Sequence, residues 1–232
     1  MKKIILFLIF IFTFTGCSKD SGAQQSIYKN ERIYTFVWIP DNYHNMKNWI
    51  KDNTKKLNIQ HVFQSGEDTM KNKNHYELKK LGNTEYIFLT INTKPESVLW
   101  ANNVLKGYPK RKAILLVDNY MKEDGTLTEF GQNIFDSVVV NNPNLLLILC
   151  GRGYGSHVRT DEIEGRKVYQ ILSDYEDEQN GENGYLKIFT VDETVPEILV
   201  ETYSPHIEDY SAVKNSLLNK ESFIINIFQD TH

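Results

Sequence analysis

The feature that most constrains the fold is a run of six consecutive apolar residues, LLLILC, at Leu145–Cys150. A strand without polar residues on either face has to be covered on both faces, and such strands are typical of parallel sheets. The run ends at a glycine-rich turn, Gly151–Gly155, which places Arg152 and Tyr154 at the end of the strand. Functional groups of open α/β sheets lie at such strand ends, so we expect a site there.

Strand and helix patterns alternate over the first two thirds of the chain. Short β-branched or aromatic runs predict strands, and apolar residues at helical spacing predict helices. The strands predicted in this part are Ile33–Ile39, Ile59–Phe63, Tyr86–Ile91, Ala113–Val117 and Leu145–Cys150, and the helices are Asn45–Leu57, a segment opened by Pro95, and Glu129–Val140. Strands without helices are predicted at Val168–Ser173, Tyr185–Val191, Glu197–Ser204 and Ser222–Phe228. The expected fold class is therefore α/β, with two packed mixed β-sheets flanked by helices.

The N-terminus has the pattern of a secretion signal. Lys2 and Lys3 precede Ile4–Phe14, an apolar run of eleven residues. A helix of that length is too short to cross about 30 Å of hydrocarbon, so a retained transmembrane anchor is not expected. The residues FTGC, which end at Cys17, resemble a bacterial lipobox, in which the cysteine becomes the lipidated first residue of the mature protein. Ordinary cleavage without lipidation is the alternative.

Length, charge and cysteine content narrow the class of protein. We expect a signal peptide at 1–16, a lipidated cysteine with a polar tether at 17–30, and a single domain at 31–232, a length that suits one hydrophobic core. The net charge of −4 and the lack of a basic run argue against a nucleic acid partner. After Cys17 only Cys150 remains, and we expect it to be a buried hydrophobic residue. The expected location is the bacterial cell envelope, with the membrane as a partner through the lipid anchor.

Segments spread over most of the domain resemble the calcineurin-like metallophosphoesterases. They occur in the order that this family shows, and they are Trp49–Asn53 before Ile59, Pro95–Ala101, Tyr108–Arg111, Pro143–Asn144, Arg159–Asp161, Leu172–Tyr175 and Thr202–Pro205. The resemblance implies a calcineurin-like phosphoesterase sandwich. It also implies a shortened middle, because the family's Gly-Asn-His segment has no clear counterpart and only a loop at Lys71–Glu85 separates the neighbouring predicted strands.

Enzymes of that family hold two metal ions between strand-end ligands, and the metals activate a water molecule. The resemblance places vestigial metal ligands at Asp41, Glu67 and Asp118, with Asp68 as an alternative to Glu67. It places three degenerate positions at Tyr43, Arg152 and Tyr154. A phenol with a pKa of about 10 is a poor ligand at neutral pH, and a guanidinium group has no lone pair to give. The resemblance therefore implies a metallophosphoesterase fold without the ligands for two-metal catalysis.

The role of Arg152 has two open readings. Its guanidinium group replaces the lost metal charge by pairing with one or two of the strand-end carboxylates, or it is solvated on a loop. Asn74-His75 looks like a remnant of the missing segment, but we assign it to the later Asn-x-Tyr segment. His157 follows the turn on an expected exposed loop, and neither histidine is expected to bind metal.

The sequence thus predicts a lipid-anchored, metallophosphoesterase-like pseudoenzyme. Its expected role is a non-catalytic binding or scaffold module for an unknown protein or small-molecule ligand, with no catalytic residue and no cofactor. One alternative is a residual metal-dependent phosphoester hydrolase that uses a single Mg²⁺, Ca²⁺ or Mn²⁺ ion on the remaining carboxylates. The other is a surface partner of a transport or glycan-uptake complex.

Overall fold

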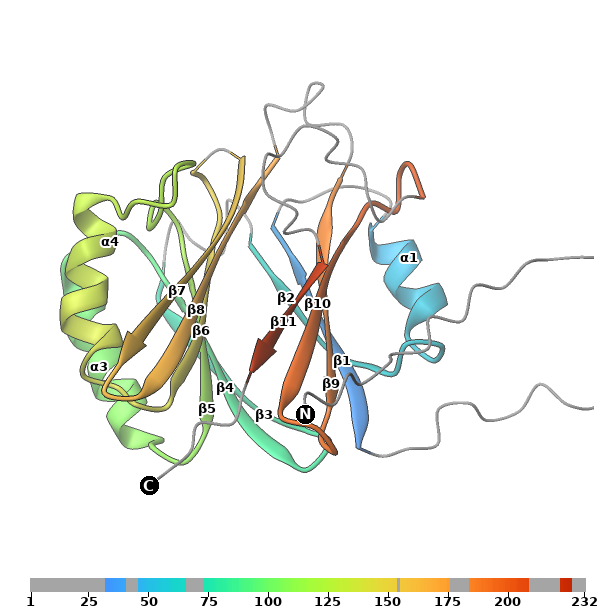
Figure 1. Cartoon of the computed structure of the whole chain (residues 1–232), viewed down its shortest axis with the longest axis horizontal. Helices are drawn as coiled ribbons and strands as arrows, with labels where there is room; N and C mark the ends of the chain where they lie inside the picture. The colour runs from blue at the N-terminus through green and yellow to red at the C-terminus, as the bar shows by residue number, and fades with distance from the viewer. Residues whose placement is uncertain are drawn as a thin grey trace, which may run out of the picture.

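The strands form two mixed sheets that face each other, with helices on the outside (Figure 1). The computed structural model describes residues 32–40, 46–65, 73–153, 155–175, 184–208 and 222–226. Sheet A has the strand order β11-β10-β9-β1-β2, and sheet B has the order β3-β4-β5-β6-β8-β7. The predicted fold class, two packed mixed sheets flanked by helices, is confirmed.

Sheet A contains the first two strands of the described chain and its last three. Its strands are β1 (Ile33–Ile39), β2 (Ile59–Gln64), β9 (Leu186–Asp192), β10 (Glu197–Tyr203) and β11 (Ser222–Asn226). β1 lies parallel to β2 and antiparallel to β9. One helix, α1 (Met46–Asn53), packs on the outer face of this sheet, where Met46 contributes to a small cluster with Val37 and Ile188.

Sheet B is the larger layer, and its centre is parallel. Its strands are β3 (His75–Leu81), β4 (Thr84–Ile91), β5 (Lys112–Val117), β6 (Leu145–Cys150), β7 (Gly155–Ile163) and β8 (Arg166–Asp174). β4, β5, β6 and β8 are parallel neighbours, while β3 and β7 pair antiparallel at the two edges. Every residue of β6 is buried, as the apolar run predicts. The outer face is covered by α3 (Glu96–Gly107), α4 (Glu129–Ile134) and the π-helical η1 (Phe135–Val139).

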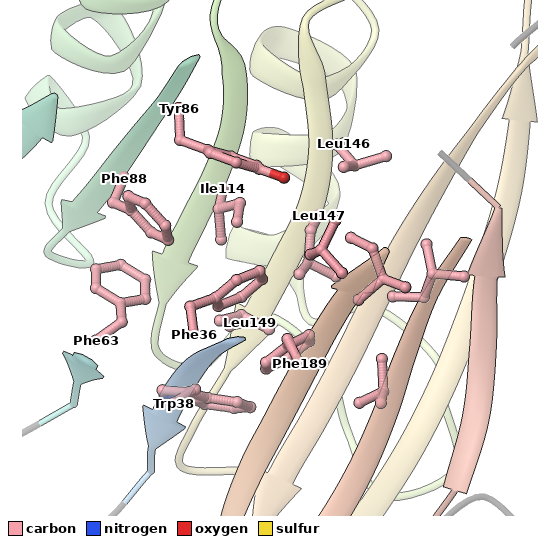
Figure 2. Packing of buried hydrophobic residues seen from close by; sticks show 14 of the residues in the cluster. Phe36, Trp38, Phe63, Tyr86, Phe88, Ile114, Leu146, Leu147, Leu149 and Phe189 are labelled. Atoms are coloured by element: carbon pink, nitrogen blue, oxygen red, sulfur yellow. The ribbon is translucent and has the colours of Figure 1, made fainter. Parts of the chain in front are cut away.

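The main core lies between the two sheets and is rich in aromatic rings (Figure 2). Phe36 of β1 stacks on Phe189 of β9, with ring centroids 4.5 Å apart and planes 6° apart. Tyr34 and Tyr86 meet across the layers, and their hydroxyl oxygens are 2.8 Å apart. Buried tyrosines satisfy their hydroxyl groups in this way while their rings contribute apolar area. Both sheets contribute aromatic side chains to this core, among them Tyr34 and Phe36 of sheet A and Tyr86 of sheet B.

Two edge strands differ from the sequence prediction. The segment expected to be a loop, Lys71–Glu85, contains β3, which forms a hairpin with β4. Its turn is tight: Gly82 has φ of +55°, and a Cβ atom there would lie 2.6 Å from the Tyr34 ring. Strand β7 was not predicted either. Both strands carry charged residues, which is how natural sheets protect their edges, and this obscures the strand pattern.

Helical segments also differ in detail. The predicted helix Glu129–Val140 begins as expected at α4 but changes to π-helical geometry at Phe135. Thr128 caps α4, since its Oγ1 accepts a hydrogen bond from the backbone N–H of Gly131 at 2.9 Å. In the part of the chain that the structure describes, no helix has the length and apolar character needed to cross a membrane.

Candidate functional site

The candidate site lies where the parallel strands of both sheets end. β9 runs antiparallel to β1, so its first residues lie beside the last residues of β1. Tyr175, directly after β8, contacts Lys187 at the start of β9. The strand ends of sheet B therefore face those of sheet A, and we refer to this end as the mouth. Trp38 closes part of it by donating a hydrogen bond from Nε1 to Ser65 Oγ at 2.9 Å.

Asp118 and Arg152 come together at the mouth. β5 and β6 are parallel neighbours. Asp118 is the first residue after β5, and Arg152 is the second residue after β6. The Nε atom of Arg152 lies 3.5 Å from Oδ2 of Asp118. The Asp118 side chain is 10% exposed and that of Arg152 is 47% exposed. The structure thus combines both readings of Arg152, since the guanidinium group pairs with one predicted carboxylate and still reaches solvent.

The turn after β6 is shaped by close backbone contacts. Arg152 has φ of 54°, a left-handed conformation that is uncommon for a residue with a side chain. A Cβ atom on Gly153 would lie 2.3 Å from the backbone oxygen of Met121, so only glycine fits there. A Cβ on Gly151 would lie 3.1 Å from Oδ1 of Asp118. The turn therefore packs directly on the loop after β5, and this packing orients Arg152 toward Asp118.

The mouth also contains a buried lysine, Lys187, that was not predicted from the sequence. Lys187 has no solvent exposure. Its ammonium group donates to Tyr175 Oη at 3.0 Å and to Thr202 Oγ1 at 2.5 Å. The ammonium nitrogen also lies 5.6 Å from the centre of the Tyr175 ring, within the range of a cation–π contact. A buried charge of this kind is costly unless it is paired and hydrogen-bonded, so its retention in the mouth points to a specific role.

The sequence did contain a signal for Lys187. Side chains of a strand alternate between faces, and Lys187 is in phase with Phe189 and Val191. Both of those residues belong to the core between the sheets. A lysine in phase with inward-facing apolar residues is a candidate for a buried functional cation.

The structure describes some of the other residues predicted at the mouth and leaves others outside the described ranges. Cys150 is fully buried, and burial raises the pKa of its thiol to about 12, so the prediction of a buried hydrophobic residue is confirmed. Tyr175, directly after Asp174, contacts β9 of the opposite sheet through Lys187. Asp41, Tyr43, Glu67, Asp68, Tyr154 and Cys17, the predicted lipidation residue, lie outside the described residues.

His157 and the Asn74-His75 segment both make contacts that stabilise the fold. His157 lies in β7 and not on an exposed loop, and its ring packs against the turn at Gly125, where a Cβ atom would be 2.2 Å from Nε2. Asn74 Oδ1 accepts hydrogen bonds from the backbone N–H of Asn92 and from Ser97 Oγ, which connects the start of β3 to the start of α3.

The described part of the mouth does not fit a two-metal centre. Its described carboxylates are Asp118 after β5 and Asp174 at the end of β8, and they are accompanied by the guanidinium group of Arg152 and the ammonium group of Lys187. Fixed positive charges raise the energy of a metal cation placed beside them. Among the residues that the structure describes, no three His, Cys, Asp or Glu side chains form a group that would hold a metal ion.

Comparisons with known proteins give distant relatives. No family model matches the chain. It is 25% identical over 289 residues to "Uncharacterized protein YvnB" of Bacillus subtilis (strain 168), and the match covers 88% of this chain and 22% of that protein. The chain thus spans about a fifth of the length of this relative. The matched length of 289 residues exceeds the 232 residues of the chain, so the relative holds additional residues within the matched region.

The comparison with solved structures gives two matches, both with a TM-score of 0.40. One is a dimetal phosphatase from Danio rerio, with a TM-score of 0.40 and 11% identity, covering 58% of this chain and 38% of that chain. The other is an uncharacterised protein from Streptococcus pneumoniae TIGR4 described as a predicted phosphoesterase, with a TM-score of 0.40 and 9% identity, covering 84% of this chain and 98% of that chain.

Proposed function

We propose that this chain is a metallophosphoesterase-like module that binds a ligand or partner without catalysis. The observation that carries the proposal is the ion pair between Arg152 and Asp118, with Nε and Oδ2 3.5 Å apart. By the resemblance of the surrounding segments, these positions belong to metal ligands. A guanidinium group cannot ligate a metal ion, but it can neutralise a carboxylate that a metal no longer neutralises.

The buried ammonium group of Lys187 supports the same proposal. It adds a second cation to the mouth, held by Tyr175 directly after β8 and by Thr202 of β10. Cations fixed in a water-poor environment attract anionic groups more strongly than cations in bulk water do. The half-exposed guanidinium group of Arg152 is therefore the group that would contact a carboxylate or phosphate of a ligand or partner protein, while the buried Lys187 acts only through its electric field.

The proposal includes a lipid anchor on Cys17, which would hold the module in the cell envelope. Its support is the lysine pair, the apolar run and the FTGC residues of the N-terminus. Intact-mass analysis of protein expressed in a bacterial host tests this part, because lipidation adds acyl chains to the mature N-terminal cysteine. A Cys17→Ser variant should lack the added mass and remain uncleaved at this site. Unmodified cysteine in mature wild-type protein would refute the anchor.

Metal content and hydrolysis separate a binding module from an enzyme. We expect elemental analysis of the purified chain to show substoichiometric divalent metal, and titration calorimetry with Mg²⁺, Ca²⁺ and Mn²⁺ to show no binding heat at the mouth. Hydrolysis of an aryl phosphate with added Mn²⁺ should not exceed that of an Asp118→Asn variant. A stoichiometric dinuclear centre would overturn the proposal. One bound metal with Mn²⁺-dependent hydrolysis that Asp118→Asn abolishes would instead identify a residual hydrolase.

A further inference from the structure

An exposed apolar surface lies at the edge of sheet B, away from the mouth. In the β3–β4 pairing, Tyr76 is opposite Leu89 and Leu78 is opposite Ile87. Directly opposed residues share a face, so Tyr76 and Leu78 lie on the same side of the sheet as α3. Tyr76 and Leu78 are each 39% exposed, and Leu99 on α3 is 67% exposed. We refer to this region, with Trp100 and Tyr108, as the β3–α3 surface.

Three aromatic rings give this surface a fixed shape. The ring of Tyr76 lies 6.2 Å from that of Trp100 and 5.6 Å from that of Tyr108, measured between centroids. The hydroxyl oxygens of Tyr76 and Tyr108 are 3.1 Å apart. Trp100 and Tyr108 are both partly exposed. Large amphipathic rings held in this way offer apolar area together with polar atoms at the rim.

The same region is basic, although the chain as a whole is acidic. Residues 73–112 contain eight lysines and arginines and three acids, a net charge of +5, whereas the full sequence carries −4. Two of the three acids are neutralised locally, Glu77 by Lys79 and Glu85 by Arg111. The exposed lysines are Lys73, Lys80, Lys94, Lys106 and Lys110. The sequence shows no basic run because these residues are spread over forty positions. Lys80 lies on β3 in phase with Tyr76 and Leu78, and Lys106 and Lys110 lie at the C-terminal end of α3 beside Tyr108.

We propose that the β3–α3 surface docks onto an anionic lipid bilayer. Exposed leucines beside tyrosine and tryptophan are the side chains that enter the boundary between headgroups and acyl chains. Surrounding lysines are attracted to anionic headgroups, and their long stems let the ammonium groups remain in the polar layer. The contact is interfacial, and it is independent of the mouth and of its proposed ligand.

The composition of the surface favours lipid over a soluble polyanion. Its exposed cations are lysines, which act as point charges, whereas the arginine of this region, Arg111, is engaged by Glu85 and by backbone oxygens of β3 and β4. A polyanion would leave Leu78 and Leu99 in water. A bilayer buries such apolar side chains, and this burial adds to the electrostatic attraction.

Quenching of Trp100 by brominated lipid tests the proposal with the full chain. The other two tryptophans lie elsewhere: Trp38 is buried in the core, and Trp49 is on α1 against sheet A. With vesicles that contain phosphatidylglycerol and brominated phosphatidylcholine, we expect quenching that a Trp100→Phe variant loses. This readout reports on the β3–α3 surface even where the N-terminal segment also binds the vesicle.

Charge variants test the electrostatic part. Replacing Lys80, Lys106 and Lys110 by Gln should weaken docking about five-fold per lysine, roughly 100-fold in all, and remove the quenching. Replacing Lys51, Lys55 and Lys56 near α1 by Gln removes the same charge from another exposed region and should leave the quenching unchanged. Leu99→Gln should reduce it without altering charge.

Three results would overturn the proposal. They are a lack of Trp100-dependent quenching on anionic vesicles, equal quenching on vesicles of phosphatidylcholine alone, and equal losses in the two lysine triples. Binding of heparin that depends on Lys80, Lys106 and Lys110, without Trp100 quenching by vesicles, would identify a polyanion site in place of a membrane contact.

Discussion

Lys187 and Tyr175 join the two sheets at the mouth, with the ammonium nitrogen 3.0 Å from the phenol oxygen. Lys187 is fully buried, and removing its ammonium group removes one hydrogen bond to Tyr175 and one to Thr202. We expect Lys187→Met, which keeps the volume of the stem, to lower the free energy of unfolding by about 1–3 kcal/mol. Urea denaturation followed by far-UV circular dichroism measures this.

A double-mutant cycle with Tyr175→Phe checks the assignment. If the contact is direct, the loss in Lys187→Met/Tyr175→Phe should be smaller than the sum of the two single losses. Strict additivity would show that the two residues act independently, and it would contradict the contact as the source of the effect.

The pair of Arg152 and Asp118 should matter little for stability. Its single contact of 3.5 Å involves a guanidinium group that is 47% exposed, and exposed pairs contribute about 0–1 kcal/mol. We expect Arg152→Ala to change the urea midpoint only slightly and to reduce it less than Lys187→Met does. A loss above about 2 kcal/mol would contradict the geometry and would indicate a tighter pairing.

Cys150 should resist alkylation in the folded chain. The thiolate is the reactive form, and burial raises the pKa of this thiol from 9.0 to about 12. At pH 8 this alone lowers the thiolate fraction about 1,000-fold. Mass spectrometry of the peptide that contains Cys150, after timed treatment with iodoacetamide, measures the rate. Labelling should become fast only in denaturant, and rapid labelling of native protein would contradict the buried position.

Central strands were predictable, and edge strands were not. β1 and β6 have the bounds predicted from sequence, because uninterrupted apolar runs mark strands that are covered on both faces. β3 and β7 carry charges along their length, so their alternation is weak in the sequence. The π-helical turn at η1 has no simple sequence signal, since it depends on how α4 packs against its neighbours.

At the candidate site, one residue pair was predictable and another was not. Asp118 and Arg152 follow adjacent parallel strands, and strand ends of that kind meet at one edge. The phase of Lys187 with Phe189 predicts that it faces the core, but its partners depend on the pairing of β9 with β1 and β10, which local patterns do not contain. Its partners Tyr175 and Thr202 come from different sheets, so only the folded structure brings the three together.

His61 should make stability depend on pH between about 4 and 6.5. It lies in β2 with its ring 4.3 Å from that of Phe88, and burial lowers its pKa from 6.5 to about 4. Nearby Glu77 and Lys79 shift this pKa in opposite directions. In this range the unfolded chain binds more protons than the folded chain, so stability falls as the pH falls from 6.5 to 4. The slope has a maximum of about 1.4 kcal/mol per pH unit.

A His61→Leu variant isolates this contribution. Carboxylates that titrate in the same range are common to both proteins, so the difference between the two stability curves belongs to His61. We expect the difference to grow as the pH falls and to level off below about 4. Parallel curves from urea unfolding at each pH would show that His61 titrates alike in the folded and unfolded chains.

α4 packs so closely on the loop after β5 that we expect no side chain to fit at Gly131. A Cβ atom there would lie 1.9 Å from the backbone oxygen of Tyr120, in the segment that follows Asp118. Gly131→Ala must therefore push the helix away, and we expect a loss of about 1–3 kcal/mol in the free energy of unfolding. Gly107→Ala at the end of α3 is the matched control, because no heavy atom lies within 4 Å of the added Cβ. That control should be neutral or stabilising by up to about 1 kcal/mol, since alanine restricts the unfolded chain. Equal urea midpoints for the two variants would contradict the close packing that positions Asp118 at the mouth.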